Sequence, residues 1–270
     1  MIGLLRKNSA IKRLRRRQMR LQGLAVVSFP KSGRTWLRFM LDQLGISPRF
    51  THENADRRAS LEYIRENIRL SDYRRVVFLH RNPLDTVVSF YNHAAYVKDW
   101  RYAPEELPGS LSEFLRHPRM GIRYILEFNK AWLESSDRFD EFLPVQYEEL
   151  RADPVAGLRR IVDFCGVVRV SDRDIERAVE AGEFGRMRQL EESGKLARRY
   201  PGTFAKAGSD PRGRKVRAGK VGSYREVLSQ QDIDYCIAQS QEAGWPLDKL
   251  LAEGDPQLES VRPRKRAKAG

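Results

Sequence analysis

The chain has 270 residues, of which 41% are hydrophobic and 32% charged, and its formal net charge is +14 at pH 7. This length and balance suit one globular domain with a buried core. Its two cysteines, Cys165 and Cys236, are too few for a disulfide framework, and no stretch approaches the ~20 apolar residues of a membrane span.

The basic residues concentrate in residues 12–20, 198–220 and 262–268. We expect residues 1–20 to form a basic N-terminal segment and residues 251–270 a basic disordered tail. No apolar stretch of the kind found in a signal peptide follows the basic N-terminus, so we expect a cytoplasmic protein. The two end segments either aid solubility only or contact an anionic membrane surface or acidic polymer.

The first candidate site lies in residues 26–37, VVSFPKSGRTWL. An apolar β-branched run stops at Pro30, and a helical pattern begins near Trp36. A strand, a short loop and a helix in this order direct backbone N–H groups at one point, which suits a phosphate or sulfate. Lys31 adds a positive charge, and Ser32 adds a hydroxyl. We therefore expect an anion-binding loop here.

A second strand, residues 76–79, is followed by Arg81 and by an Asn-Pro pair that begins a helix. Helical spacing predicts that Asp85, Ser89 and His93 share one face. Open α/β sheets bind ligands at the carboxyl ends of their strands, where Arg81 lies. Arg81 can hold a phosphate with two hydrogen bonds, and Ser89 can add a hydroxyl.

Two further segments follow in chain order. Residues 142–147 predict a strand that ends at Tyr147, after which Asp153 caps a helix reaching Cys165. Residues 212–225, RGRKVRAGKVGSYR, are basic and rich in glycine without any period, so they predict a loop. A loop of this kind is, taken alone, usually solvated surface.

Strands alternating with helices predict an α/β fold: a single three-layer domain, residues 21–250, with a mainly parallel central sheet covered on both faces. Residues 183–225 read as a long charged loop, either a lid or disordered. Ser229 and Asp232 resemble a capping box for a helix reaching about Ala243. The other helices are expected at residues 111–116, 119–135, 154–165 and 172–181.

The order Pro-Lys-Ser-Gly-x-Thr-Trp resembles the 5′-phosphosulfate loop of the sulfotransferase family, which uses 3′-phosphoadenosine 5′-phosphosulfate (PAPS) as sulfuryl donor and has a P-loop-NTPase-like fold. The family holds the donor's 3′-phosphate with an arginine and a serine eight residues later, a spacing that Arg81 and Ser89 share. The resemblance also places Tyr147 near the adenine, and Arg217 and Gly219 in the loop that closes over the nucleotide. Ala218 and Ser223-Tyr224 depart from the family pattern there, and Lys215 or Lys220 is a candidate for the missing charge. The predicted donor-binding residues are Lys31, Ser32, Gly33, Arg34, Thr35, Trp36, Arg81, Ser89, Tyr147, Arg217 and Gly219.

The resemblance implies in-line transfer of the sulfuryl group to a hydroxyl or amine, with Lys31 stabilising the leaving phosphate. We expect no catalytic metal. The histidine segment that carries the base in cytosolic members of the family is absent, and we take His52 as its substitute. Glu53 is the alternative, because other branches of the family use a glutamate. His93 is a candidate for the wall of the acceptor pocket.

Two other functions compete with this interpretation. A P-loop kinase or NTPase requires GxxxxGK[ST], and the chain has no glycine four or five residues before Lys31. A nucleic-acid-binding protein is suggested by the net charge, but the basic runs hold almost no stacking aromatics, so we expect no specific nucleic-acid partner. The sequence does not distinguish a glycan, a lipid and a small molecule as the acceptor. It also leaves the oligomeric state open. The aromatic residues Tyr91, Tyr96, Trp100 and Tyr102 form either a pocket wall or core.

Overall fold

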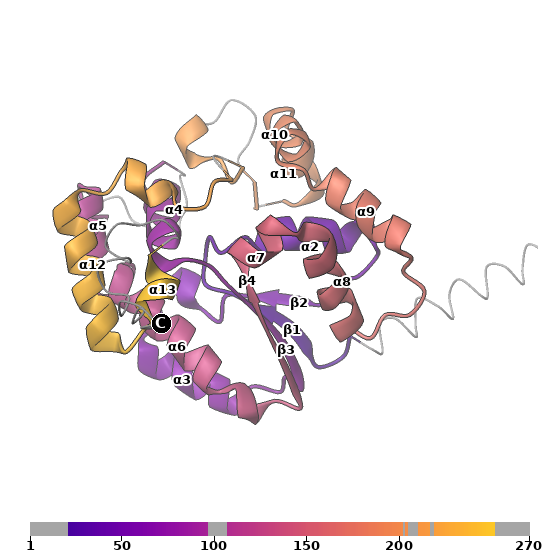
Figure 1. The fold of residues 1–270 in the computed structure, drawn as a ribbon, viewed down its shortest axis with the longest axis horizontal. Helices are drawn as coiled ribbons and strands as arrows, with labels where there is room; N and C mark the ends of the chain where they lie inside the picture. The colour runs from indigo at the N-terminus through magenta and orange to yellow at the C-terminus, as the bar shows by residue number, and fades with distance from the viewer. Residues whose placement is uncertain (1–20, 97–106, 202, 205–209, 217–218, 252–270) are drawn as a thin grey trace, which may run out of the picture.

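The fold is built on a four-stranded parallel sheet in the order β2-β1-β3-β4 (Figure 1). The computed structural model describes residues 21–96, 107–201, 203–204, 210–216 and 219–251. The strands are β1 (Leu24–Val27), β2 (Arg49–Thr51), β3 (Arg75–His80) and β4 (Glu141–Gln146). All three neighbouring pairs are parallel, so the four carboxyl ends meet at one edge. The predicted α/β domain with a parallel sheet is confirmed.

Alternating side chains of the strands divide the interior into two cores, one on each face of the sheet. Leu24 and Val26 of β1 enter one core, and Ala25 and Val27 enter the other. The first face is covered by α2 (Arg34–Gln43), α7 (Tyr147–Ala152), α8 (Pro154–Phe164) and α9 (Asp172–Ala181). The second is covered by α3 (Leu61–Leu70), α4 (Pro83–Tyr96), α5 (Leu111–Arg116), α6 (Ile122–Glu134), α12 (Gln230–Ala243) and α13 (Leu247–Leu250). These two helix layers and the sheet are the three predicted layers (Figure 1).

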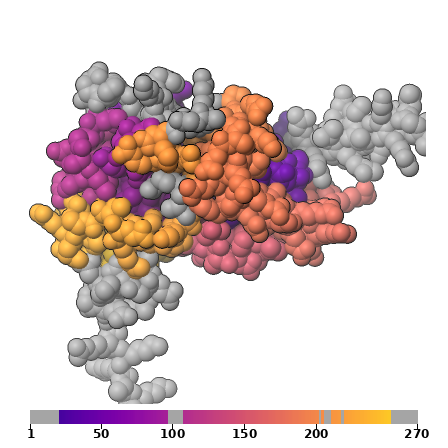
Figure 2. Space-filling model, turned by 90° about the horizontal axis from the view of Figure 1, so that it is seen from above, coloured from indigo at the N-terminus to yellow at the C-terminus, as the bar shows by residue number. Residues whose placement is uncertain are grey.

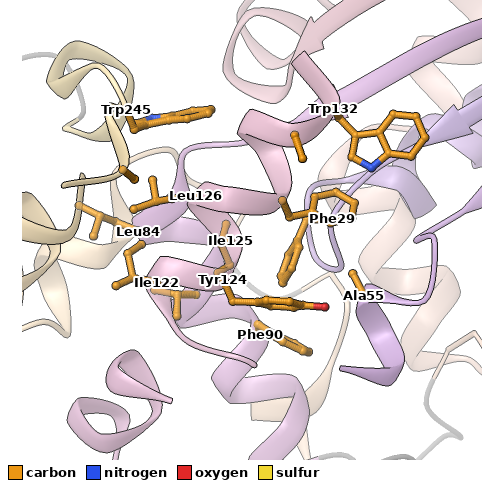
Figure 3. Packing of buried hydrophobic residues seen from close by; sticks show 14 of the residues in the cluster. Phe29, Ala55, Leu84, Phe90, Ile122, Tyr124, Ile125, Leu126, Trp132 and Trp245 are labelled. Atoms are coloured by element: carbon orange, nitrogen blue, oxygen red, sulfur yellow. The ribbon is translucent and has the colours of Figure 1, made fainter. Parts of the chain in front are cut away.

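Aromatic side chains fix the entrance to the first candidate loop. Phe29 is fully buried, and the centre of its ring lies 5.6 Å from that of Phe90 and 5.8 Å from that of Tyr124 (Figure 3). Such edge-to-face pairs stabilise beyond the area that they bury. Because Phe29 immediately precedes Pro30 and Lys31, this core anchors the chain at the point where it enters the loop.

A third, smaller core lies beside α2. It joins Phe39 of α2 to Met187, Leu196, Tyr200 and Phe204. These residues belong to or follow α10 (Phe184–Glu192) and α11 (Lys195–Arg199). The prediction of one long loop over residues 183–225 was therefore wrong, since both helices are too short and too charged to show a clear apolar period. Figure 2 looks down on the orange segment that contains them.

The observed ends of several other helices and strands can be compared with those that the sequence predicts. Helices α5 and α9 have the predicted ends, whereas α6 begins at Ile122 rather than at residue 119. β4 ends at Gln146, one residue earlier than expected, because Tyr147 already begins α7. Ser229 caps α12 because its hydroxyl accepts from the Asp232 amide. The Asp232 carboxylate does not complete the predicted capping box by binding the Ser229 amide; it accepts instead from Ser112, Arg116 and the Ser229 hydroxyl. The short 3₁₀ turns are η1 (Ala55–Arg57), η3 (Ser136–Arg138), η4 (Pro211–Gly213) and η5 (Ser223–Glu226).

Both cysteines are buried free thiols. Among the described residues, no helix is long and apolar enough to cross a membrane. No group of three or more metal-binding side chains is found in the same part of the chain. The basic segment 1–20, the tail from residue 252, Trp100 and Tyr102 lie outside the described residues.

Candidate active site

A cavity of about 250 Å³ opens beside the carboxyl ends of the strands. Six basic side chains and one acidic side chain line its described walls, an excess of positive charge that favours an anionic ligand. The basic residues are Lys31, Arg34, Arg38, Arg81, Arg151 and Lys215, and the acidic residue is Asp56.

The loop between β1 and α2 forms one wall of the cavity. Lys31 and Gly33 both have positive φ, 71° and 92°, which turns the backbone sharply into the helix. Helix α2 has no side-chain cap at Gly33 and no acidic residue in its first turn. An N-terminus of this kind keeps its positive potential for an external anion. The anion-binding loop that the sequence predicts therefore has the required local geometry.

Gly33 is required by a close approach as well as by its backbone angle. A Cβ atom at this position would lie 2.5 Å from Cδ2 of Tyr147. Real Cβ atoms do not approach another atom so closely, so only glycine fits beneath this ring. Tyr147 begins α7 at the end of β4, and its ring contacts that of Trp36 edge-on at 5.8 Å. The first loop and the third predicted segment therefore pack directly against each other.

Arg81 follows β3 and lies beside the same tyrosine. Its side chain is only 11% exposed, and its guanidinium carbon lies 4.7 Å from the centre of the Tyr147 ring. Nη1 donates to the carbonyl of Lys31 at 3.4 Å, and Nε is buried with no hydrogen-bond partner in the described chain. Ser89 and His93, on the facing side of α4, line the cavity with it. Arg81 thus retains a donor that an oxyanion can satisfy.

Asp85 does not line the cavity with Ser89 and His93. Its carboxylate is fully buried and accepts hydrogen bonds from the amide of Gly222, the amide of Tyr224 and the hydroxyl of Ser223. Shared helical spacing put these three residues of α4 on one face, but Asp85 lies in the first turn, where the chain from 222 to 224 covers it. The Oδ2 atom of Asp85 lies 3.5 Å from Nη2 of Arg81.

His52, the predicted base, lines the cavity at the end of β2. Its Nδ1 atom lies 2.8 Å from the carbonyl oxygen of Ser28. Because a carbonyl oxygen can only accept, Nδ1 carries the hydrogen in the neutral ring and Nε2 is the nitrogen that can take up a proton. Glu53, the alternative base, is buried, accepts from the hydroxyl of Tyr73 at 2.6 Å and does not line the cavity.

The opposite wall includes residues from segments 182–187 and 203–204, which carry no sequence motif. The indole Nε1 of Trp36 donates to the carbonyl of Gly182 at 2.8 Å, which fixes the ring against the end of α9. Arg151 of α7 lies over the same ring at 5.7 Å. Phe184 begins α10 and packs against Gly219, where a Cβ atom would lie 2.7 Å from its ring. The lining residues that sequence reasoning did not assign include Arg38, Asp56, Arg151, Gly182, Phe184, Met187, Thr203, Phe204 and Val216.

The predicted site residues fall into three groups. Those that line the cavity are Lys31, Gly33, Arg34, Thr35, Trp36, His52, Arg81, Ser89, Tyr147 and Gly219. Ser32 is buried beside it, with a hydroxyl that finds no hydrogen-bond partner among the described residues, and Arg217 lies outside them. Of the two lysines considered for the missing charge, Lys215 lines the cavity and Lys220 turns to Glu226 at 3.2 Å.

Of the four aromatic residues left open between pocket wall and core, Tyr91 and Tyr96 are described, and Trp100 and Tyr102 lie outside the described residues. Tyr91 packs against Phe114 in the core, with ring centres 5.5 Å apart, and Tyr96 lies under Arg212. Neither residue lines the cavity. The described aromatic lining consists of Trp36, Tyr147, Phe184 and Phe204.

A parallel α/β sheet with an anion-binding loop at its carboxyl edge defines a nucleotide- or phosphate-binding class of protein. Residues 22–242 match the family described as "Sulfotransferase domain". The chain belongs to this family.

Two curated relatives illustrate the similarity. Flavonol 3-sulfotransferase of Flaveria bidentis is 26% identical over 175 residues, which cover 52% of this chain and 55% of that protein. Sulfotransferase 2A1 of Rattus norvegicus is 25% identical over 181 residues, which cover 65% of this chain and 59% of that protein. The matches therefore span little more than half the length of these relatives.

Solved structures share the fold. Mouse sulfotransferase SULT7A1 complexed with PAP, adenosine 3′,5′-bisphosphate, superposes with a TM-score of 0.59 at 17% identity, over 82% of this chain and 83% of that one. Retinol dehydratase in a complex with retinol and PAP superposes with a TM-score of 0.54 at 18% identity, over 82% of this chain and 80% of that one.

Proposed function

We propose that this chain transfers the sulfuryl group of PAPS to a hydroxyl or amine group of an acceptor. The observation that carries the proposal is that two anion-binding elements line one cavity. One is Lys31 at the open N-terminus of α2, and the other is Arg81 with Ser89 on α4. A nucleotide with phosphate groups at both ends of its ribose needs two such elements within reach of each other.

The residues of the cavity suit the donor in charge and in aromatic surface. The excess of basic side chains matches the several negative charges of PAPS, and Trp36 and Phe184 provide aromatic surface for a base. Lys31 and the N-terminus of α2 would hold the 5′-phosphosulfate, and Arg81 and Ser89 the 3′-phosphate. Lys215 would add the charge that Ala218 lacks. Arg217 stays a prediction for the same loop.

In the transfer, the acceptor oxygen or nitrogen bonds to sulfur while the bond from sulfur to the 5′-phosphate oxygen breaks. Lys31 and the α2 amides stabilise the charge that develops on that leaving oxygen. His52 takes the acceptor proton at Nε2, with the Ser28 carbonyl holding the ring through Nδ1. PAP and the sulfated acceptor are the products. The sulfuryl group carries one negative charge, so we expect these groups to suffice without a metal ion.

The names of the relatives indicate the general chemical class of the acceptor. One relative is named for a flavonol, and one structural neighbour is bound to retinol. Both are small molecules with a hydroxyl group, and this favours such an acceptor over a glycan; retinol is also a lipid, so a small hydroxyl-bearing lipid stays among the candidates. A cytoplasmic location agrees with the relatives named cytosolic sulfotransferases. Contact of the basic end segments with an anionic membrane stays a prediction.

The proposal is tested by calorimetric titration with PAP, with adenosine 5′-monophosphate and with ATP plus magnesium. We expect tight binding of PAP only, and a weakening of about tenfold or more for PAP on Arg81→Ala, because charge-assisted hydrogen bonds are lost. Arg74→Ala removes an exposed arginine beside the same strand and serves as the control. A screen of hydroxyl and amine acceptors with sulfur-labelled donor then measures transfer.

Binding of ATP in preference to PAP would favour the kinase alternative and overturn the proposal. Equal losses for Arg81→Ala and Arg74→Ala would remove Arg81 from the donor site.

A further inference from the structure

One stretch of the cavity wall is a loop that ends in the first two residues of η5. We call residues 215–216 and 219–224 the glycine loop; residues 217 and 218 lie outside the described residues. It lines the cavity through Lys215, Val216, Gly219 and Ser223. A loop without regular structure needs other contacts to hold its backbone in one position, since each ordered residue costs conformational entropy.

Glu191 of α10 holds the beginning of the loop. Its side chain is 3% exposed, and its two carboxylate oxygens accept from consecutive backbone amides, Lys215 at 3.0 Å and Val216 at 2.9 Å. A carboxylate that is buried this deeply requires such donors. Glu192, the next residue, instead forms an exposed ion pair with Arg214. The two neighbours therefore make very different contacts with the same segment.

Asp85 of α4 holds the end of the loop. Oδ2 accepts from the Gly222 amide at 2.8 Å, and Oδ1 accepts from the Tyr224 amide at 3.1 Å and the Ser223 hydroxyl at 3.0 Å. Tyr224 is fully buried in the core beneath. The loop is thus bound at each end to a buried carboxylate, one from α10 and the other from α4.

Between these ends, the loop carbonyls meet two arginines of the cavity. Arg151 donates to the carbonyl of Gly219 at 3.3 Å, and Arg81 to that of Lys220 at 3.4 Å. Both distances are long for such bonds, and both arginines also face the cavity. The position of the loop and the position of the arginines are therefore linked.

We propose that Asp85 and Glu191 are positioning residues that hold the glycine loop in the arrangement that binds the donor nucleotide. Neither carboxylate lines the cavity, so each acts through the loop that it binds. This inference rests on the proposed function for the identity of the nucleotide. When an anchor is lost, the loop spends less time in the binding arrangement, and the apparent dissociation constant rises by the inverse of the remaining fraction.

The test uses the full chain with Glu191→Gln and Asp85→Asn. In either variant an amide NH₂ replaces one acceptor oxygen and faces a backbone N–H, so one anchor bond is lost with little change in volume. Glu192→Gln and Glu226→Gln are the controls, because they remove exposed carboxylates that pair with Arg214, next to the loop, and with Lys220, within it. Hydrogen exchange of the peptide spanning the loop is measured without ligand, and PAP affinity is measured by calorimetry.

We expect faster exchange in the loop of both anchor variants, unchanged exchange in β1 and β3, and PAP binding weakened about tenfold or more. The controls should match the wild type in both measurements. Glu191→Gln is the more informative variant, because Glu191 has no contact with Arg81 and lies outside the two main cores. It also carries the test if Asp85→Asn fails to fold.

The outcomes separate the two claims. Unchanged loop exchange in the anchor variants overturns the anchoring, whether or not PAP binds. Faster exchange with unchanged PAP affinity overturns the link between the loop and the donor. Absence of PAP binding by the wild type overturns the proposed function, while the exchange measurement still decides whether the carboxylates anchor the loop.

Discussion

Replacement of Gly33 by alanine tests whether the approach of Tyr147 shapes the first loop. The φ angle of 92° lies in the left-handed region, where an L-residue with a Cβ costs about 1–2 kcal/mol. The added Cβ would also lie 2.5 Å from the Tyr147 ring, and overpacking of this kind costs about 1–3 kcal/mol. The free energy of unfolding should therefore fall by about 2–5 kcal/mol for Gly33→Ala.

Gly244→Ala is the matched control. Gly244 also has positive φ, at 66°, but its Cβ would meet only the Nζ atom of Lys130 at 3.6 Å. Its cost should be the backbone part alone, about 1–2 kcal/mol. Urea unfolding of both variants, without ligand, gives the difference.

A double-mutant cycle assigns that difference to its cause. With Tyr147→Ala in the background, Gly33→Ala should cost no more than Gly244→Ala, because the ring that it meets is gone. Equal costs of Gly33→Ala in the presence and absence of the Tyr147 ring would refute the reasoning. So would equal costs of Gly33→Ala and Gly244→Ala in the otherwise native chain.

The other predictions concern charge and proton transfer. Lys31→Ala should lower turnover with the best acceptor about 10²–10³-fold at an unchanged melting temperature. Lys195→Ala, which removes an exposed lysine of α11 that does not line the cavity, is its control, and retained turnover of Lys31→Ala would contradict the role. His52→Ala should lower the rate about 10²–10⁴-fold while PAP affinity stays within about twofold. A larger loss for Glu53→Gln than for His52→Ala would transfer the role of base to Glu53. Burial, together with the nearby Lys249, lowers the pKa of His80 to about 4, so between pH 6.5 and 4 the unfolded chain binds a proton that the folded chain does not. Stability should therefore fall by about 3 kcal/mol as the pH is lowered through this range, and His80→Gln should flatten the dependence in pH-resolved urea unfolding; an equal slope in both proteins would contradict it.

The sequence predicted the parts of the fold that local patterns determine. Residues 24–27 and 76–79 are all apolar because parallel strands are covered on both faces, and that pattern is visible without a structure. The loops after these strands carry residues with recognisable chemistry, Lys31 and Arg81. Their meeting in one cavity follows from the parallel order of β1 and β3. The short edge strand β2 and the helices α10 and α11 lack such patterns and were not predicted.

The wall opposite Lys31 depends on contacts between distant segments. Phe184 belongs to the cavity because Gly219 packs against its ring, and Trp36 is fixed by the carbonyl of Gly182. No spacing in the sequence indicates either contact. For Asp85, helical spacing places the residue one turn before Ser89, but the sequence does not indicate that the chain near Gly222 covers its carboxylate.

The amide of Asn82 connects the start of α4 to the far end of the described chain. Its Nδ2 atom donates to the carbonyl of Leu250 at 2.5 Å, while its Oδ1 atom accepts from the amides of Leu84 and Asp85. Leu250 and Leu251 are buried, although the family match ends at residue 242. A chain cut at residue 242 would leave Nδ2 of Asn82 without its acceptor, next to Arg81, and would take two buried leucines out of the core, so the last nine described residues belong to the folded domain.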